Sequence, residues 1–435
     1  MAVKAGYILG ANSSRGIIKP APRLYPHQWS WDTAFIVLGL AHFDVPLARH
    51  NLDALFAGQW RNGMVPHIVF DQHAGGYFPG PDRWDCRELS PNAPAEPQTS
   101  GICQPPVHAL AAASVLQYAG RQGADEVSST ARWFAGFYPK LLAWHRFLAR
   151  ERVDARTGLV GIFHGWESGM DNSPRWDGPY SRVKVPPTLP PYQRLDLGHV
   201  TDAAERPTNA EYDRYLWLVE EAKLAGYDQA KLASSGSFHA GDVFFTAIYA
   251  AANERLAGLS DMLGAREASE LRSYADAARS AVLAVVDAPS GLAADVDLRT
   301  GELLTTECIS GFAPLVSGKP PEALGRDLVR LLMGPRWAGD PKLRWPVPPS
   351  TSPGSSAFRA RSYWRGPTWP VTTWLLSWAL ERDGEGAAAR ALKQAGLEQL
   401  EEGTFAEYYE PYTGEPLGSA HQSWTAAVTL DWAFS

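Results

Sequence analysis

The sequence has only three cysteines, no excess of positive charge and no long apolar run, and each scarcity excludes a class of protein. Cys86, Cys103 and Cys308 form no CxxC pair, so neither a zinc ribbon nor a disulfide scaffold is indicated. We expect all three to be small buried residues. The net charge of −7 argues against nucleic acid as a partner, because binding it requires a basic surface. No stretch resembles a membrane span of about 20 apolar residues.

Targeting and cofactor motifs are also missing. The first twenty residues include Lys4 and Arg15 and lack the apolar run and cleavage site of a signal peptide, so we expect a cytoplasmic protein. There is no HExxH, P-loop, dinucleotide GxGxxG or GxSxG sequence. His27, His67 and His73 lack a metal-ligand spacing, and we expect neither a metal nor a cofactor.

Aromatic residues, in contrast, are abundant. The chain has 17 Trp, 16 Tyr and 16 Phe among 435 residues. Many of the tryptophans stand beside Gly, Pro, Arg or Asp, as they do in loops. Flat apolar faces with a polar edge suit a pocket whose walls stack on sugar rings.

Helical patterns dominate the rest of the chain. Residues 31–44 are apolar nearly all round, as in a buried helix. Further helices are expected at 51–60, 106–119, 128–152, 210–225, 240–263, 266–287, 321–333, 369–382, 386–402 and 423–434. This number is close to the twelve that six helix pairs need, and paired helices fit a toroid better than a βαβ fold. No repeat indicates a solenoid.

Three segments are poor in periodic pattern and rich in Gly and Pro: 61–105, 174–208 and 334–362. Loops of this length in a compact domain are usually functional or disordered. We expect them to lie over one mouth of the toroid, with 61–105 and 174–208 as cap loops and 174–208 as a lid. The alternative for 174–208 is an inert surface insertion.

The block GWESGMDNSPRWD at 165–177 is the strongest chemical signal. Glu167, Asp171 and Asp177 lie among tryptophans, and Gly169 favours a tight turn. A carboxyl group buried against indoles has a raised pKa, because its charged form is poorly solvated, and so can stay protonated as a general acid near neutral pH. The alternative is a turn with capping residues.

Two further blocks stand where helices begin. In LYPHQWSWDTAF at 24–35, Asp32 follows Trp29 and Trp31 and could grip adjacent sugar hydroxyls or simply stabilise a helix N-terminus. In SYWRGPTW at 362–369, Arg365 could orient a carboxylate or stack in a corner of the core.

The last block is FAEYYEPYTGEPLGSAHQSWT at 405–425. Glu407 stands beside two tyrosines, and the rival carboxylates Glu410 and Glu415 look more solvent-facing. Glu407 and Asp171 lie on separate loops, so only the fold can bring them together.

In this order the blocks resemble those of the glycosidases that include trehalase and the processing α-glucosidase. WDTAFIVLGL and ESGMD followed by SPRW resemble trehalase sequences. SYWRGPTW, EYYEPYTGE and SWTA resemble glucosidase sequences. The matches run from about residue 25 to residue 424, nearly the whole chain.

The resemblance implies an all-α (α/α)6 toroid, formed by a single domain of residues 1–435, and an inverting mechanism. Asp171 would protonate the leaving oxygen as general acid, and Glu407 would activate water as general base. Their carboxyl groups would then lie about 6.5–9.5 Å apart, and the first-formed sugar would be the β-anomer.

The short chain, without the extra domain of the processing glucosidases, is similar to the compact bacterial members that hydrolyse mannosylglycerate and glucosylglycerate. YPHQWSWD, GGYFPGP, QPPVH and AHQSW all resemble that subgroup. By this resemblance the residues that bind the sugar are Tyr25, Gln28, Trp29, Trp31, Asp32, Tyr363, Trp364, Trp369 and Gln422. Trp166 and Gly169 are also expected to bind the substrate. Glycerate carries a carboxylate and needs a cationic partner, for which Arg206 is the candidate, helped by His67, Tyr77, Gln104 and Tyr212. The alternative for Arg206 is a plain surface residue.

Several alternatives remain open. The substrate could be a neutral disaccharide or a short α-glucan, which would make Arg206 dispensable. The toroid could bind sugar without catalysis and tolerate loss of Asp171 or Glu407. A sugar epimerase would rely on histidines, and no block centres on one. The sequence does not rank mannose against glucose; a small sugar is the expected partner, and a homo-oligomer is possible by analogy.

Overall fold

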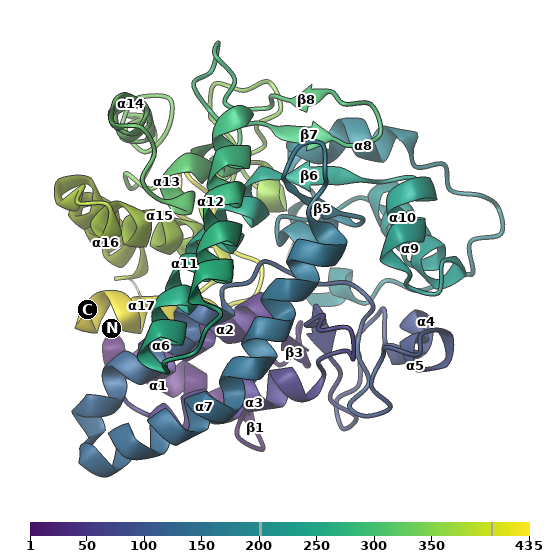
Figure 1. Ribbon diagram of the computed structural model, residues 1–435. Helices are drawn as coiled ribbons and strands as arrows, with labels where there is room; N and C mark the ends of the chain where they lie inside the picture. The colour runs from purple at the N-terminus through teal and green to yellow at the C-terminus, as the bar shows by residue number, and fades with distance from the viewer. Residues whose placement is uncertain (200–201, 402) are drawn as a thin grey trace.

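A computed structural model describes residues 1–199, 202–401 and 403–435. The contacts between its main helices, which Figure 1 labels, form a closed double ring. Along the inner ring each helix contacts the next, and the last contacts the first. In chain order the inner helices are α2 (Ser30–Leu40), α6 (His108–Tyr118), α11 (Val243–Met262), α13 (Ala313–Ser317), α15 (Pro370–Arg382) and α17 (Ser423–Phe434).

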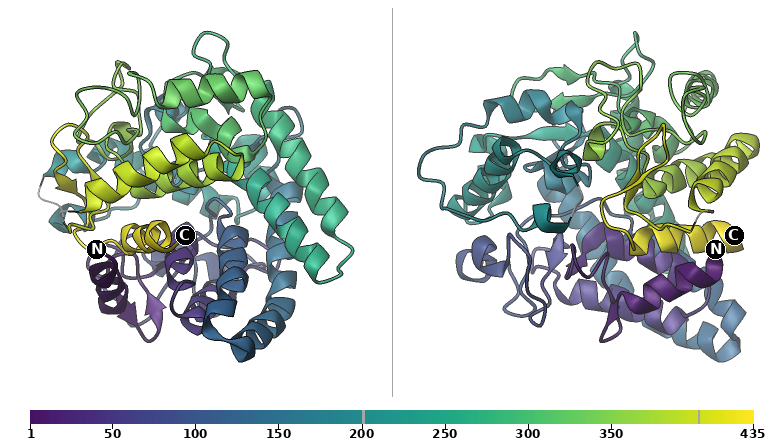
Figure 2. Two further views of the ribbon diagram at one scale, coloured as in Figure 1. Left: turned by 90° about the vertical axis from the view of Figure 1, so that its left-hand side faces the viewer. Right: turned by 180° about the vertical axis from the view of Figure 1, so that it is seen from behind.

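Each inner helix has an outer partner. The outer helices are α1 (Ala2–Ala11), α3 (Val45–Ala57), α7 (Ala124–Phe147), α12 (Ala268–Ala284), α14 (Glu322–Leu332) and α16 (Gly386–Leu400). They pack on α17, α2, α6, α11, α13 and α15, respectively. The predicted (α/α)6 toroid is therefore confirmed. The contact between α1 and α17 brings the two ends of the chain together, as Figure 2 shows from two sides.

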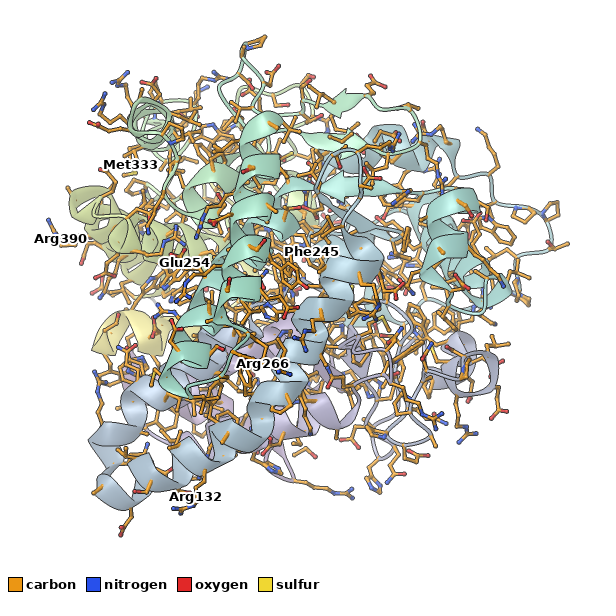
Figure 3. All side chains as sticks on the ribbon, in the orientation of Figure 1. Arg132, Phe245, Glu254, Arg266, Met333 and Arg390 are labelled. Carbon is orange, nitrogen blue, oxygen red and sulfur yellow. The ribbon has the colours of Figure 1, made fainter. Side chains whose placement is uncertain are left out.

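Burial separates the two rings. All eleven residues of α2 are buried, whereas α14 buries only Leu328 and Leu332. Figure 3 shows the same contrast: Phe245 of α11, 0% exposed, lies inside, and the exposed Arg390 of α16 extends outward. Helices that are apolar all round belong in the core, and amphipathic ones cover it.

Most helices follow the sequence prediction within a few residues. The helix expected at 51–60 begins earlier, at Val45, because Asp44 caps it by accepting a hydrogen bond from the backbone of Leu47 at 2.9 Å. The helices α1, α10 (Gln229–Ser235) and α13 were not predicted. The predicted end of one helix at residue 402 lies outside the described residues.

A small antiparallel sheet was also not predicted. Its strands, in spatial order, are β5 (Val160–Ile162), β6 (Ala240–Asp242), β7 (Asp295–Asp297) and β8 (Leu303–Leu304). Strands of two or three residues are too short to show an alternation of apolar and polar residues. The sheet matters because β5 leads directly into the block at 165–177.

The two predicted cap segments lie together on one side of the toroid (Figures 1 and 2). The segment 61–105 holds β4 (Ile68–Val69), which pairs with β3 (Gln28–Trp29), and the short helices α4 (Pro81–Trp84) and α5 (Cys86–Leu89). The segment 174–208 holds α8 (Asp177–Arg182), and its residues 200–201 lie outside the described residues. The rings of Phe78 and Tyr192 stack at 5.7 Å and join the two segments.

Two other expectations concern the whole chain. The three cysteines are buried and unpaired, as expected. Among the helices of the described residues, none has the length and apolarity that crossing a bilayer requires.

Candidate active site

A cavity opens at the N-terminal ends of several inner helices. About 850 Å³ free of protein atoms lies inside it and in front of its mouth, open solvent included. Trp31 and Asp32 line it from the first turn of α2, Gln104 from the loop before α6, and Trp424 from the first turn of α17. The aromatic and polar blocks stand at helix starts in the sequence, and the closed ring therefore brings them to one place.

Asp171 lies in a loop between two short helical turns, Gly165–Ser168 and Pro174–Trp176. The loop turns at Gly169, whose φ is +70°, and a Cβ there would lie 2.4 Å from the indole of Trp31. A glycine is therefore required both by the backbone and by the close approach to Trp31. This packing holds the loop against the cavity wall, and the side chain of Asp171 lines the cavity.

The environment of Asp171 favours its protonated form. Burial raises the pKa of this carboxyl to about 7; the guanidinium of Arg206 opposes the shift, and the negative charge of Glu407 adds to it. A carboxyl group with such a pKa carries a proton in a substantial fraction of molecules at neutral pH.

Glu407 is held in place from three directions. The hydroxyl of Tyr25 donates to its Oε1 at 2.8 Å, and that of Tyr363 donates to the same atom at 3.4 Å. The backbone N–H of Ser419 donates to Oε2 at 3.2 Å. The residue directly precedes β9 (Tyr408–Tyr409), which pairs with β10 (Pro416–Leu417). Burial raises the pKa of Glu407, while Arg206 and these hydrogen bonds oppose the rise.

Gly418 lies against this carboxylate, with φ at +69° and an added Cβ only 2.5 Å from Glu407 Oε2. We expect Gly418→Ala to displace Glu407 and to slow any reaction that depends on this carboxylate by about 10²-fold, as small misplacements of reacting groups do. The control is Gly414→Ala, which has φ at +78° but meets the ring of Trp345. Steady-state rates and melting temperatures should show that both variants are destabilised and only Gly418→Ala is slow.

Asp32 is a third carboxyl group in the cavity. It is 5% exposed, and burial, followed by the charge of Glu407, raises its pKa well above the ordinary value. Asp32, Asp171 and Glu407 share this cavity with the guanidinium of Arg206, so their charges are strongly coupled.

Arg206 reaches into the cavity from segment 174–208. Its Nη1 donates to the hydroxyl of Tyr25 at 2.9 Å, its Nε forms an ion pair with Asp196 at 3.3 Å, and its guanidinium lies 4.6 Å from the centre of the Tyr363 ring. With its side chain 9% exposed, Arg206 is not a plain surface residue. Through Tyr25 it is linked to Glu407.

The cavity brings together fourteen of the residues that the sequence singled out. They are Tyr25, Trp29, Trp31, Asp32, His67, Tyr77, Gln104, Trp166, Gly169, Asp171, Arg206, Tyr212, Tyr363 and Glu407.

Four predicted residues lie behind the lining instead. Gln28 donates to the backbone oxygen of Asn51 at 2.8 Å. The indoles of Trp364 and Trp369 stack on each other at 3.6 Å. Gln422 accepts a hydrogen bond from the hydroxyl of Ser419. In this arrangement the four support the wall, and direct contact with a sugar stays a prediction for them.

Several lining residues were missed. Asp196, Tyr215 and Trp424 line the cavity. Trp424 stands in the SWTA sequence at a helix start, which was a usable signal, whereas Tyr215 lies within α9 (Asn209–Leu224) and reads as an ordinary core residue. The expectation that Glu410 faces solvent is wrong. It is 5% exposed, because its carboxylate accepts hydrogen bonds from the backbone of Tyr412 and the hydroxyl of Thr413 and closes a turn.

Three residues of the cavity lining carry buried hydrogen-bonding atoms that have no partner in the described ranges. His67 Nδ1, the hydroxyl of Tyr215 and Trp424 Nε1 are buried and have no partner within the part of the chain that the structure describes. Buried polar atoms without partners are unfavourable, and these three belong to residues of the cavity lining. Within the same described ranges, no three His, Cys, Asp or Glu side chains are grouped to hold a metal ion.

The chain matches known glycoside hydrolases along its length. Residues 25–425 match the family model of the mannosylglycerate hydrolase MGH1-like glycoside hydrolase domain. The glucosylglycerate hydrolase of Mycolicibacterium hassiacum is 48% identical over 434 residues, which cover 99% of this chain and 97% of that protein.

Solved structures agree with the sequence match. The GH63 mannosylglycerate hydrolase of Thermus thermophilus, crystallised with Tris and D-glycerate, superposes with a TM-score of 0.90 at 38% identity and covers 99% of both chains. The neutral trehalase of Saccharomyces cerevisiae superposes with a TM-score of 0.53 at 14% identity, over 96% of this chain and 73% of that one, and so shares the fold.

Proposed function

We propose that this chain, which belongs to the MGH1-like mannosylglycerate hydrolase family of glycoside hydrolases, is an inverting α-glycosidase. It hydrolyses mannosylglycerate, glucosylglycerate or both to hexose and glycerate. The observation that carries the proposal is one cavity holding Asp171, whose pKa is raised to about 7, and Glu407, which is anchored by Tyr25. A protonated and an ionised carboxyl group are what inversion requires.

In the proposed reaction Asp171 donates its proton to the glycosidic oxygen as the bond to the anomeric carbon breaks. Glu407 takes a proton from a water molecule, whose oxygen attacks the opposite face of that carbon. The products are glycerate and the β-anomer of the hexose. Both tyrosines donate to Glu407 Oε1. Among the described residues, the second oxygen, Oε2, accepts only from the backbone N–H of Ser419, at 3.2 Å.

The proposed sugar site is the part of the cavity formed by Tyr25, Trp29, Trp31, Asp32 and Tyr363. The carboxyl group of Asp32 would hydrogen-bond to sugar hydroxyls, and the indoles would cover the apolar faces of the ring. Trp166 and Gly169 complete the wall beside Asp171. Behind this lining, Gln28, Trp364, Trp369 and Gln422 would hold these residues in place.

The proposed glycerate site contains the cation Arg206 and the uncharged polar side chains of His67, Tyr77, Gln104 and Tyr212. Arg206 is paired with Asp196 through Nε, so its other nitrogens are those that would meet a substrate carboxylate. Burial lowers the pKa of His67 well below the ordinary value, and a neutral imidazole with a free Nδ1 suits a glycerate hydroxyl better than a charge would.

We expect Arg206→Ala to raise the KM for a hexosylglycerate by about 10–100-fold, the loss typical of a hydrogen bond between charged groups worth about 1.5–3 kcal/mol. Because Arg206 also donates to Tyr25, kcat should fall as well, for acidic and neutral glycosides alike. Exposed Arg359, which donates to the backbone of Phe358, provides the control in Arg359→Ala. Equal KM changes on a hexosylglycerate and on a neutral aryl α-hexoside would count against the carboxylate contact.

Proton NMR of the purified protein with α-mannosylglycerate, and separately with α-glucosylglycerate, tests the proposed function. We expect the β-anomer signal of the hexose to appear first, and the faster substrate identifies the sugar. Cleavage of trehalose or a short α-glucan alone would leave the family standing and reject the glycerate site. Failure to cleave any of them would favour a sugar-binding protein.

The proposal also covers the domain organisation of the protein, its partner and its location. Residues 1–435 would form one catalytic domain, with 61–105 and 174–208 as its cap over the cavity. A hexosylglycerate would be its small-molecule partner, and the expected location is the cytoplasm, with assembly into a homo-oligomer possible by analogy.

A further inference from the structure

Glu167 stands four residues before Asp171, is fully buried, and has no place in the reaction described above. The guanidinium of Arg152 donates to both its oxygens, at 2.6 Å from Nη2 and 3.1 Å from Nη1. The backbone N–H groups of Phe163 and Cys103 donate to it at 2.7 and 3.1 Å. Burial opposes the ionisation of Glu167, but Arg152 and these donors outweigh it and lower its pKa. The carboxylate is thus ionised and held by donors from three separate parts of the chain.

The contact with Cys103 connects Glu167 to the opposite wall of the cavity. The next residue, Gln104, lines the cavity and accepts from the backbone N–H of Trp31 at 3.3 Å. The preceding residue, Ile102, accepts from the backbone N–H of His67 at 2.7 Å. His67 is therefore tied by a backbone hydrogen bond to the segment that Glu167 holds, and Gln104 belongs to that segment.

The other contacts connect Glu167 to the loop that carries Asp171. Phe163 directly follows β5, and Arg152 is the last residue of the π-helical turn Leu148–Arg152, which follows α7. Between Glu167 and Asp171 the loop has little freedom, because Gly169 packs against Trp31 and Ser168 accepts from the backbone of Met170 at 2.9 Å. A displacement of Glu167 would be passed along these four residues to Asp171.

We propose that Glu167, held by Arg152, is a positioning residue that sets the place of the Asp171 carboxyl group relative to the wall that receives the leaving glycerate. The inference rests on the proposed function, because it needs Asp171 to be the general acid. A general acid works only within hydrogen-bond reach of the leaving oxygen, and an error of about 1 Å can cost about 10²-fold in rate. Glu167 touches neither substrate nor water in this scheme and acts only through the loop.

A buried ion pair that merely stabilises the fold would behave differently from a positioning pair. Loss of a purely structural contact would lower the melting temperature and slow every substrate to the same degree. Loss of a contact that places the acid slows only those substrates whose leaving group must be protonated. An α-hexosyl fluoride provides the comparison, because its carbon–fluorine bond breaks with fluoride leaving as an anion that needs no proton from the enzyme.

The experiment compares Glu167→Gln with wild type on the hexosylglycerate and on the α-fluoride of the same hexose. We expect kcat on the hexosylglycerate to fall by about 10²-fold and kcat on the fluoride to stay near wild type. Asp431→Asn is the matched control. It also removes a carboxylate charge, one that accepts from His42 at 2.7 Å and from Trp374 at 2.8 Å, but it lies outside the cavity lining. Both of its rates should match those of wild type.

Equal losses on the two substrates, or no loss on either, would overturn the inference. If Glu167→Gln does not fold, Arg152→Lys keeps the positive charge but removes the two-pronged contact and should give the same dependence on the leaving group. Asp171→Asn, measured alongside, separates the two proposals. If it lacks that dependence, the acid assignment fails; if it has the dependence and the Glu167 and Arg152 variants do not, only the positioning role fails.

Discussion

Asp171→Asn is expected to lower kcat on a hexosylglycerate by about 10²–10⁴-fold, the usual contribution of a general acid. The amide keeps the shape of the side chain, so contacts around Gly169 and Trp31 remain, but it has no proton to give to the leaving oxygen. Steady-state rates with the preferred hexosylglycerate measure the effect. A folded variant with near-wild-type kcat would remove Asp171 from the acid role.

The dependence of kcat/KM on pH in the wild-type enzyme tests the same role of Asp171. Asp171 must be protonated to act, and its pKa is about 7, so kcat/KM for the hexosylglycerate should fall as the pH rises through about 7. Glu407 must be ionised, and its raised pKa moves the acid-side loss to a pH above the range of an ordinary glutamate. In Asp171→Asn the fall on the alkaline side should disappear from whatever rate remains.

The melting temperature of Asp171→Asn shows whether its loss of activity has a structural cause. The pKa of Asp171 is higher in the folded protein than in the unfolded chain, so the folded state binds the proton more tightly. By linkage this group lowers the stability of the fold as the pH rises from about 4 to about 7, and the lowered stability persists at higher pH. Asn cannot ionise, so at pH 8 the variant should melt no lower than wild type. A clear drop in melting temperature would indicate that the loss of activity is structural.

The sequence shows which residues are neighbours along the chain but not which loops meet in the fold, and this limits how much of the site it could predict. Asp171 and Glu407 were found because each stands in a loop where aromatic residues surround a carboxylate. Their meeting in one cavity depends on the closure of α17 onto α2, which no local pattern contains. The resemblance to known glycosidases supplied that information.

The misses have equally specific causes. Short elements such as α13 and the strands of the small sheet contain too few residues for a period to be read. Glu410 was misjudged because its burial comes from hydrogen bonds within its own turn. The sequence marks Gln28 and Trp29 as one block, yet neighbouring residues in a strand point to opposite sides, and only Trp29 lines the cavity.

Glu407→Gln should lower kcat by about 10²–10⁴-fold, and unlike Asp171→Asn it should do so on the hexosylglycerate and on the α-hexosyl fluoride alike. The base acts on the attacking water, which both substrates need, whereas the acid acts on a leaving group that only one of them has. The two oxygens of Glu407 accept hydrogen bonds from Tyr25, Tyr363 and Ser419. Glutamine offers only one oxygen to these three donors, so we also expect a modest loss of stability.

Glu410→Gln is the natural control, since it makes the same chemical change three residues further on, in a carboxylate that closes a turn and lies outside the cavity lining. It should lose stability and keep its kcat. If the two variants slow hydrolysis of the fluoride equally, the defect belongs to the folding of this hairpin and Glu407 is not the base. If Glu407→Gln slows only the hexosylglycerate, its carboxylate serves the leaving group, and the two catalytic roles assigned to Asp171 and Glu407 must be exchanged.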